Sequence, residues 1–300
     1  MLLLFGLLTA LSFGVADFLA GLVGKKISPL TLTFYSQAIG AVTISVLAII
    51  FGGEIVFSDL AWGAAAGFVL GTGFILYYKA LSSGRMGVVA AVTGVGTAII
   101  PFSVGLLLGE QPAITAMFGI VLVILSIALV SSGNKIESGS EQDVDENLIS
   151  SSLFLRYRFQ RGFLVCHRDV IQAAIAGLWL GFFFVFLGQA QTTSPLWPAA
   201  SATVFSALSV AVFIPFLKPD WGFSRKIRWV IVAVGLCQTL GTLTFVVAAN
   251  LGMLSVAGVA GALSPVPTAI LAFLVLKEKP NWVQVTGILA ALSGVVMMNA

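Results

Sequence analysis

One carboxylate stands inside an apolar run near the start of the chain. Asp17 belongs to the stretch FGVADFLAGLVGKK, which otherwise has the composition of a membrane-spanning helix. An ionised aspartate near the centre of a bilayer costs roughly 2.5 kcal/mol or more. Asp17 precedes Lys25 by about 12 Å of helix, which is close to half of the ~30 Å hydrocarbon core. We therefore expect Asp17 to lie near the midplane and to face the interior of a helix bundle.

Two uses of Asp17 are compatible with that position. The carboxylate could carry a proton or a coupling cation, or contact a polar group of a substrate. Alternatively, it could form a structural pair with a hydroxyl or an amide on a neighbouring helix, for instance Gln37. Both hypotheses place Asp17 against other helices and away from lipid.

Other polar and aromatic side chains lie at depth in apolar segments and are candidates to line a central cavity. Interhelical hydrogen bonds would equally explain the amides and hydroxyls, and anchoring at the lipid interface would explain the aromatic rings. Lys79 either extends toward the nearby basic face or partners an anionic substrate. The candidates are Tyr35, Gln37, Tyr77, Tyr78, Lys79, Trp179, Trp197, Gln238 and Thr239.

Prolines occur inside two apolar segments, in GVGTAIIP, which ends at Pro101, and in LSPVP, which holds Pro265 and Pro267. A proline removes a backbone donor and clashes with the preceding turn of a helix. We therefore expect both segments to be interrupted as helices, either as ordinary kinks or as paired breaks. Paired breaks in the two halves of a transporter indicate a central site or a hinge.

Two glutamates, Glu110 and Glu278, each precede a proline by two residues at the expected start of a helix. A carboxylate there can cap the first N–H groups and interact favourably with the helix dipole. We expect them to be N-terminal caps, and the functional alternative is that they act as gates.

The composition identifies the solvent as a bilayer. Of the 300 residues 59% are hydrophobic and 9% are charged, whereas a soluble domain has about 25% charged residues. Mean hydropathy is +1.07. The apolar run at the N-terminus is interpreted as a first spanning helix and not as a cleaved signal. We predict an all-α integral protein of the cell (inner or plasma) membrane, with spans at about 3–23, 30–51, 60–81, 87–108, 113–132, 169–190, 196–217, 228–249, 254–276 and 281–299.

The sequence repeats itself. GEQP at 109–112 matches KEKP at 277–280, and the same spacing of 168 residues pairs Gly67 with Gly235 and Gly119 with Gly287. Each copy holds five spans, so the second must enter the membrane inverted relative to the first, as in many secondary transporters. We predict a first repeat over 1–133, a polar cytoplasmic linker over 134–168 and a second repeat over 169–300. Near the start of the repeats the spacing is 166 residues, which pairs Asp17 with Phe183, so the charge belongs to one repeat only.

The basic residues predict an orientation. All 15 Lys and Arg residues fall in or beside the loops that follow odd-numbered spans. The positive-inside rule therefore predicts that both termini lie outside and that the 134–168 linker is cytoplasmic.

The ordered motifs resemble the drug/metabolite transporter superfamily, EamA type. The first copy offers Phe13-Gly14, Pro29, Pro101, Gly109-Glu110, Pro112 and Gly119, and the second offers Pro195, Pro265, Pro267, Glu278, Pro280, Gly287 and Gly294. The resemblance implies a permease, with export as the expected direction. Two features depart from it: family habit places the termini in the cytoplasm, and Lys277 replaces the glycine of the second Gly-Glu pair.

These observations predict a ten-helix secondary transporter that moves a small organic metabolite or drug-like solute by alternating access. The expected partners are that solute, the lipid bilayer and, as a candidate coupling ion, the proton; no nucleic acid, cofactor or metal is expected. With His167 as the one histidine and no phosphate-binding loop, no enzymatic constellation is expected. The chain would act as a monomer or a homodimer. The alternatives are a membrane-embedded structural or partner protein, a lipid flippase or a membrane enzyme.

Overall fold

The computed structural model describes residues 1–24, 26–83, 86–132, 171–190, 194–217, 221–222, 224–276 and 282–298. Within these ranges every regular element is a helix, as the composition predicts. The predicted linker at 134–168 lies outside the described residues, as do Lys25 and Glu278. The first repeat contains α1 (Leu2–Val23), α2 (Pro29–Phe51), α3 (Phe57–Ser83), α4 (Met86–Leu107) and α5 (Ile114–Ser132). The second contains a helix over Ile171–Gly188, then α7 (Leu196–Leu217), α8 (Arg225–Asn250), α9 (Leu254–Gly261), α10 (Pro265–Leu276) and α11 (Trp282–Met298).

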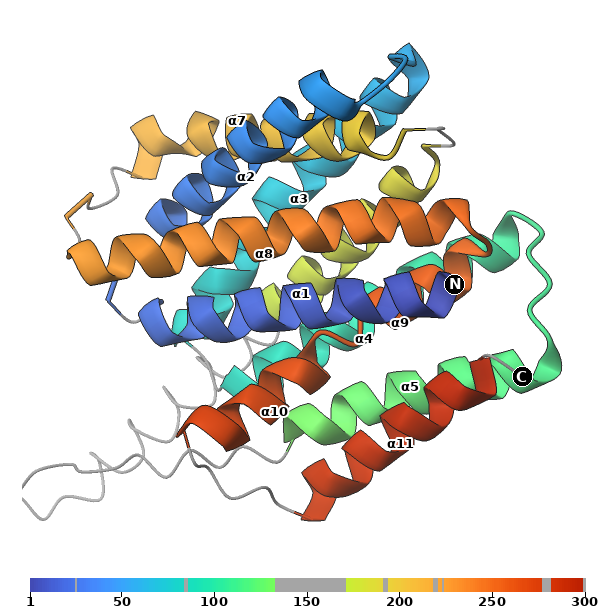
Figure 1. Ribbon diagram of the computed structural model, residues 1–300. Coiled ribbons are helices and arrows are strands. Elements are labelled where there is room, and N and C mark those ends of the chain that lie inside the picture. The colour runs from blue at the N-terminus through green and yellow to red at the C-terminus, as the bar shows by residue number, and fades with distance from the viewer. Residues whose placement is uncertain are drawn as a thin grey trace, which may run out of the picture.

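Seven segments of the described chain are long and apolar enough to cross a membrane, and α9 together with α10 counts as one of them. Water is absent from the bilayer core, so the backbone N–H and C=O groups of these apolar segments must pair with each other, and a helix pairs them within one segment. Pro29 occupies the first turn of α2, where its missing N–H costs nothing. Three shorter apolar helices, Val92–Leu107, Ile114–Val130 and Trp282–Met298, bring the number in the described chain to ten. Figure 1 shows both termini at the same end of the bundle, as an even number of spans requires.

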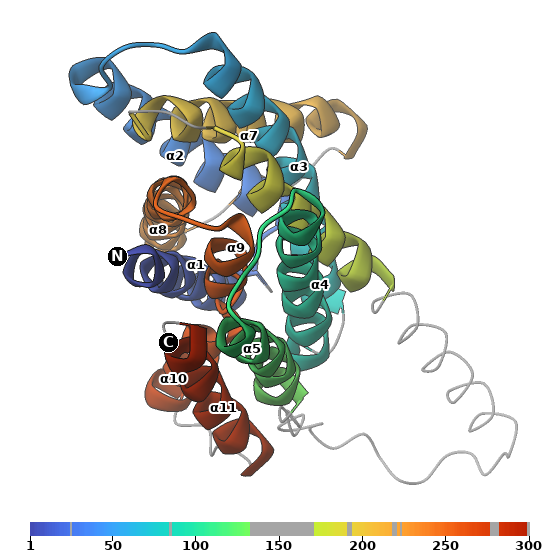
Figure 2. The same ribbon diagram turned by 90° about the vertical axis from the view of Figure 1, so that its right-hand side faces the viewer.

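Helices of one repeat pack mainly against helices of the other. The most extensive pairs are α3 with α7, α5 with α11, α1 with α8 and α2 with α7. The pairs α3·α7 and α2·α8 are equivalent under exchange of the two repeats, and α5 and α11, which lie side by side in Figures 1 and 2, exchange with each other. The chain therefore forms one interleaved body with an internal pseudo-twofold relation.

Glycines allow the closest of these approaches. A Cβ atom added at Gly119 would lie 2.6 Å from the carbonyl oxygen of Gly294, and one added at Gly294 would lie 2.8 Å from that of Gly119. The backbones of α5 and α11 are therefore in direct contact, a packing that only small residues permit in a membrane.

The two proline-containing segments differ, which corrects the expectation of paired breaks. The segment that starts at Leu254 is interrupted: α9 ends at Gly261 and α10 begins at Pro265. α4 continues as a helix through Pro101. A single proline removes one donor, whereas Pro265 and Pro267 together remove two within the same turn. The backbone break is therefore confined to the second repeat.

Candidate functional site: a cavity between the repeats

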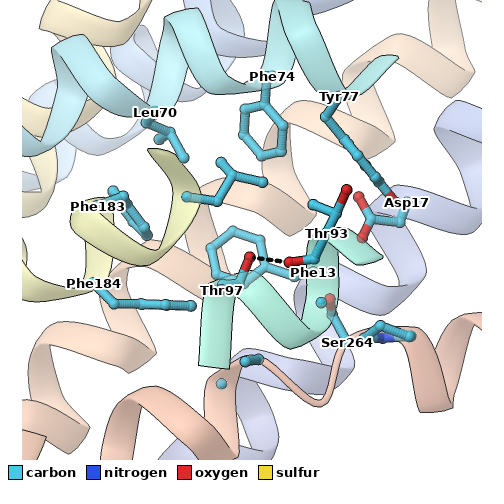
Figure 3. Close-up of a pocket in the computed structure, with 15 residues that line it drawn as sticks. Phe13, Asp17, Leu70, Phe74, Tyr77, Thr93, Thr97, Phe183, Phe184 and Ser264 are labelled. Carbon is cyan, nitrogen blue, oxygen red and sulfur yellow. Dashed lines mark hydrogen bonds between the residues drawn. The ribbon is translucent and has the colours of Figure 1, made fainter. Parts of the chain in front are cut away.

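A cavity lies where the two repeats meet. It holds about 510 Å³ of empty space, part of which is open to the outside. Its walls come from α1, α3 and α4 of the first repeat, and from the Ile171–Gly188 helix and the α9–α10 break of the second. Figure 3 shows these side chains converging from several helices. The cavity is the structure's best candidate for a binding site.

Asp17 lines this cavity and is partly exposed within it. Among the described residues that form the walls, it alone carries a charge. Its carboxyl group has a hydrogen-bonding interaction with the side chain of Ser264, at the α9–α10 break. It also interacts electrostatically with the phenols of Tyr77 and Tyr78 on α3. The expectation that Asp17 faces the bundle interior is met, and its hydroxyl partner comes from the other repeat.

The position of Asp17 depends on how α1 meets the α9–α10 break. A Cβ atom at Gly14 would lie 2.7 Å from the carbonyl oxygen of Ser264 and 2.8 Å from the ring of Pro267, so only glycine fits there. The Thr268 hydroxyl donates to the carbonyl of Gly14 at 2.9 Å. These contacts hold the helix one turn before Asp17 against the break, so the carboxylate faces Ser264.

Three of the predicted polar candidates form one hydrogen-bonded chain behind the cavity wall. Gln37 Nε2 donates to Gln238 Oε1 at 3.0 Å, and Gln238 Nε2 donates to Tyr78 Oη at 2.9 Å. All three side chains are buried, and they come from α2, α8 and α3. Gln37 therefore bonds to Gln238 and not to Asp17. The three hydrogen-bonded side chains orient the phenol of Tyr78, which interacts with the Asp17 carboxylate.

The opposite wall is aromatic. Phe13 packs edge-on against Phe183 and Phe184, with ring centroids 6.4 and 6.3 Å apart. The Phe184 and Phe245 rings are 4.4 Å apart. On the polar side, Phe74 stacks on Tyr78 with ring centroids 5.4 Å apart. Edge-to-face and offset pairs such as these are favourable because of the ring quadrupole. The cavity thus has a polar side around Asp17 and an aromatic side around Phe184.

Hydroxyl groups bind α4 to the Ile171–Gly188 helix along the cavity. Thr93 donates to the carbonyl of Ala173 at 3.1 Å, and Thr97 interacts with the carbonyls of Gly177 and Thr93 at 3.3 and 2.8 Å. The second Thr97 contact is the dashed line in Figure 3. The bonds to Ala173 and Gly177 fix the relative position of the two helices that carry the aromatic side and the floor of the cavity.

Other predicted candidates lie away from the cavity walls. Tyr35 packs edge-on against Trp221, with centroids 5.6 Å apart, and Lys79 is exposed. Trp179 is 37% exposed and donates to Thr72 Oγ1 at 2.9 Å. Thr239 is buried where α8 meets α2, and its hydroxyl donates to the carbonyl of Gly235 at 2.8 Å. Of the proline candidates, Pro265 lines the cavity, Pro267 contacts Gly14, and Pro101 packs against α9 at Gly258.

Glu110 caps a helix, but not the one that follows it in the chain. Its carboxylate accepts from the backbone N–H groups of Leu254 and Ser255, at 2.5 and 2.9 Å. The expected cap for α5 therefore serves α9 of the other repeat. The functional alternative, a gate, is compatible with this cross-repeat contact. Glu278, its repeat counterpart, lies outside the described residues.

Sequence reasoning missed Ser264, Thr93 and Thr97 as cavity residues. The repeat register contained a signal, because the spacing of 168 residues pairs Gly94–Gly96 with Ala262–Ser264. Several residues from these two stretches line the cavity. Aligning the two repeats through their proline-containing segments would therefore have predicted that these two stretches form the floor of the cavity.

Known proteins match this chain over both repeats. A family model described as the EamA-like transporter family matches residues 1–132 and 168–300. An uncharacterised protein of Methanocaldococcus jannaschii is 28% identical over 134 residues, which are 44% of this chain and 97% of that protein. A crystal structure described only as that of a protein has a TM-score of 0.75 at 14% identity and covers 99% of this chain and 98% of the other, which shows the fold alone. The family match and the apolar helices identify a multi-pass integral membrane protein.

Proposed function

Because this chain belongs to the EamA-like transporter family, we propose that it is a secondary transporter that moves a small organic solute by alternating access. The observation that carries the proposal is the cavity between the inverted repeats, with Asp17 in its wall. A site at the repeat interface becomes accessible from either side when the repeats rock against each other. The proposed solute site is this cavity.

Two features support movement around the cavity. The α9–α10 break replaces continuous helix with a short turn, and such turns at the ends of elements absorb the dihedral changes of a hinge. The Glu110 carboxylate holds the start of α9 to the loop between α4 and α5. We propose that this contact closes one end of the pathway and breaks when that end opens.

Asp17 is proposed to couple transport to protons. A carboxylate in a membrane cavity can exchange a proton for a solute group, so that the two compete for one site. Among the described residues, the titratable groups that interact with it are the phenols of Tyr77 and Tyr78. An outward solute flux would then be driven by an inward proton flux.

Transport in proteoliposomes tests the proposal. Solutes are first selected by thermal stabilisation of the detergent-solubilised protein, and their flux is then followed under an imposed pH gradient. We expect gradient-driven flux in the wild type and its loss in Asp17→Asn, an isosteric change. Glu54→Gln removes an exposed carboxylate far from the cavity walls and should transport normally. A folded Asp17→Asn variant that transports like the wild type at every pH would overturn the coupling role.

A further inference from the structure

We propose that the solute is a small organic cation, an amine or quaternary ammonium compound that carries apolar or aromatic groups. The inference rests on the proposed function in taking the cavity as the solute site. Three observations support it: the carboxylate in the cavity wall, the aromatic side chains that line the cavity, and the backbone groups at the α9–α10 break.

Ionised Asp17 makes the cavity negative, with no compensating charge in its described walls. Asp17 is the one carboxylic acid among the described wall residues, and those residues include no Lys or Arg. Its carboxyl group interacts with the Ser264 hydroxyl and with the phenols of Tyr77 and Tyr78, which are neutral groups. A carboxylate removed from water requires a counter-charge or a proton. A cationic solute supplies the first, and a proton replaces it when the solute leaves.

The rings complete a site for a cation with an apolar body. Phe13, Tyr77, Phe183 and Phe184 all line the cavity that Asp17 enters. Figure 3 shows Phe183 and Phe184 on one side, Phe13 in the middle, and Tyr77 beside Asp17 on the other side. Aromatic faces attract an ammonium group within about 6 Å of the ring centre, and this attraction strengthens when water is excluded. Ammonium ions with alkyl or aryl groups fit such a surface better than strongly hydrated inorganic ions.

The backbone at the break disfavours an anion. The start of a helix usually binds anions through free N–H groups. At the start of α10, Pro265 and Pro267 have no N–H. The N–H groups of Val266 and Thr268 donate to the carbonyls of Leu263 and Ser264, at 2.9 and 3.2 Å.

Pro265 also removes the usual backbone donor to a carbonyl of a residue that lines the cavity. Pro265 cannot donate to the carbonyl of Gly261, four residues earlier, and Gly261 lines the cavity. Carbonyl groups at the end of a broken membrane helix favour cations. An anionic solute would therefore meet a carboxylate and carbonyl groups, with no free N–H from the first turn of α10.

Equilibrium binding of a charge series tests the inference. The full-length protein in a non-ionic detergent is titrated with benzyltrimethylammonium, benzyl alcohol and benzenesulfonate, which share a phenyl group and differ in charge. We expect saturable binding of the cation at least about tenfold tighter than of the other two, a difference of ~1.4 kcal/mol. Asp17→Asn should weaken cation binding by about tenfold or more and leave benzyl alcohol unchanged, because the neutral probe has no charge to pair.

Two further variants keep the test decisive. Phe184→Leu should weaken binding of the cation more than that of benzyl alcohol, because it removes a ring face and retains an apolar side chain. Asp17→Glu should retain cation binding, and Glu54→Gln is the matched control outside the cavity. If Asp17→Asn does not fold, the wild-type charge series and Phe184→Leu decide the question.

The outcomes separate this inference from the proposed function. Equal affinity for all three probes, or tighter binding of benzenesulfonate, overturns the cation site even if another solute is transported. Cation binding without transport of any cation in proteoliposomes supports the site and contradicts the transporter. Transport of a neutral solute that benzyltrimethylammonium does not inhibit keeps the transporter and rejects the cation as its solute.

Discussion

The two repeats share a backbone plan but contribute opposite chemistry to the cavity. The repeat spacings pair Asp17 with Phe183, Tyr77 with Phe245 and Tyr78 with Val246. The first repeat thus places a carboxylate and two phenols where the second places hydrocarbon. Gln238 of the second repeat, paired with Leu70, supports Tyr78 of the first. An inverted repeat can therefore conserve its packing while its side chains diverge into a polar and an aromatic wall.

Among the described helices, the two repeats also differ in backbone at the cavity. α4 is continuous, whereas its counterpart is divided into α9 and α10. The divided element brings Ser264 to Asp17. The continuous element instead binds its neighbouring helix through Thr93 and Thr97. One repeat therefore supplies a continuous helix to the wall, and the other supplies the break that we propose as the hinge.

The largest expected effect comes from placing a carboxylate in the aromatic wall. Phe183 is 1% exposed and contacts the rings of Phe13, Phe184 and Phe245. Phe183→Asp removes those contacts and buries a charge without a partner, at a cost of ~3 kcal/mol or more. Thermal unfolding in detergent should show a strongly lowered Tm. Phe183→Leu, the control, keeps the site apolar and should lower Tm much less; equal Tm values for Phe183→Asp and the wild type would mean that the two walls are interchangeable.

A smaller loss of stability should follow when Gln238 is replaced by leucine, the residue at the equivalent position of the first repeat. Gln238→Leu copies Leu70 and leaves the buried amide of Gln37 and the Tyr78 hydroxyl without a partner. We expect a destabilisation of ~2 kcal/mol. The double variant Gln37→Leu/Gln238→Leu should cost less than the sum of the two single changes, because no unpaired amide remains. Unfolding free energies that add within about 0.5 kcal/mol would contradict this coupling.

Loss of the Glu110 cap on α9 should destabilise the protein about half as much as Gln238→Leu. Glu110→Ala removes both acceptors from the start of α9, a loss of about 1 kcal/mol. Hydrogen exchange should accelerate at the amides of Leu254 and Ser255 and remain unchanged in α8. Glu54→Ala, at an exposed site, is the control. Unchanged exchange at Leu254 would show that another group can replace the carboxylate.

The smallest effect on stability, but not on transport, is expected at the break. Pro265→Ala restores an N–H that can donate to Gly261, and this gain offsets the entropy that proline removes from the unfolded chain. The unfolding free energy should change by less than about 0.5 kcal/mol. Solute flux should fall, because a more continuous helix bends less easily. Pro101→Ala in the continuous α4 should leave flux closer to the wild type, and a reversed order would place the hinge in the first repeat.

Helix positions and the inverted repeat could be predicted from the sequence, because long apolar runs and a constant spacing are linear signals. It could also be predicted that Asp17 faces the bundle interior and that Gln37 and Gln238 are buried. Their partners could not, because helices that are apolar all round do not reveal which face points inward. Asp17 was a candidate partner of Gln37, yet Gln37 bonds to Gln238.

Contacts between residues far apart in the sequence could not be predicted from local sequence patterns. Glu110 was expected to cap the helix after it, because capping is usually local, but its partners lie 144 and 145 residues away. The two proline segments were expected to behave alike, and they differ because one has a single proline and the other has two within one turn. Orientation in the membrane remains a prediction from the positive-inside rule.

The cap on α9 has a consequence for biogenesis. α9 has eight residues and begins with N–H groups that Glu110 satisfies from the other repeat. The first N–H groups of any helix lack an acceptor within the helix and need one from elsewhere. A chain is synthesised from its N-terminus, so Glu110 is made before α9. We therefore expect the start of α9 to complete its assembly on a carboxylate that the amino-terminal half already provides.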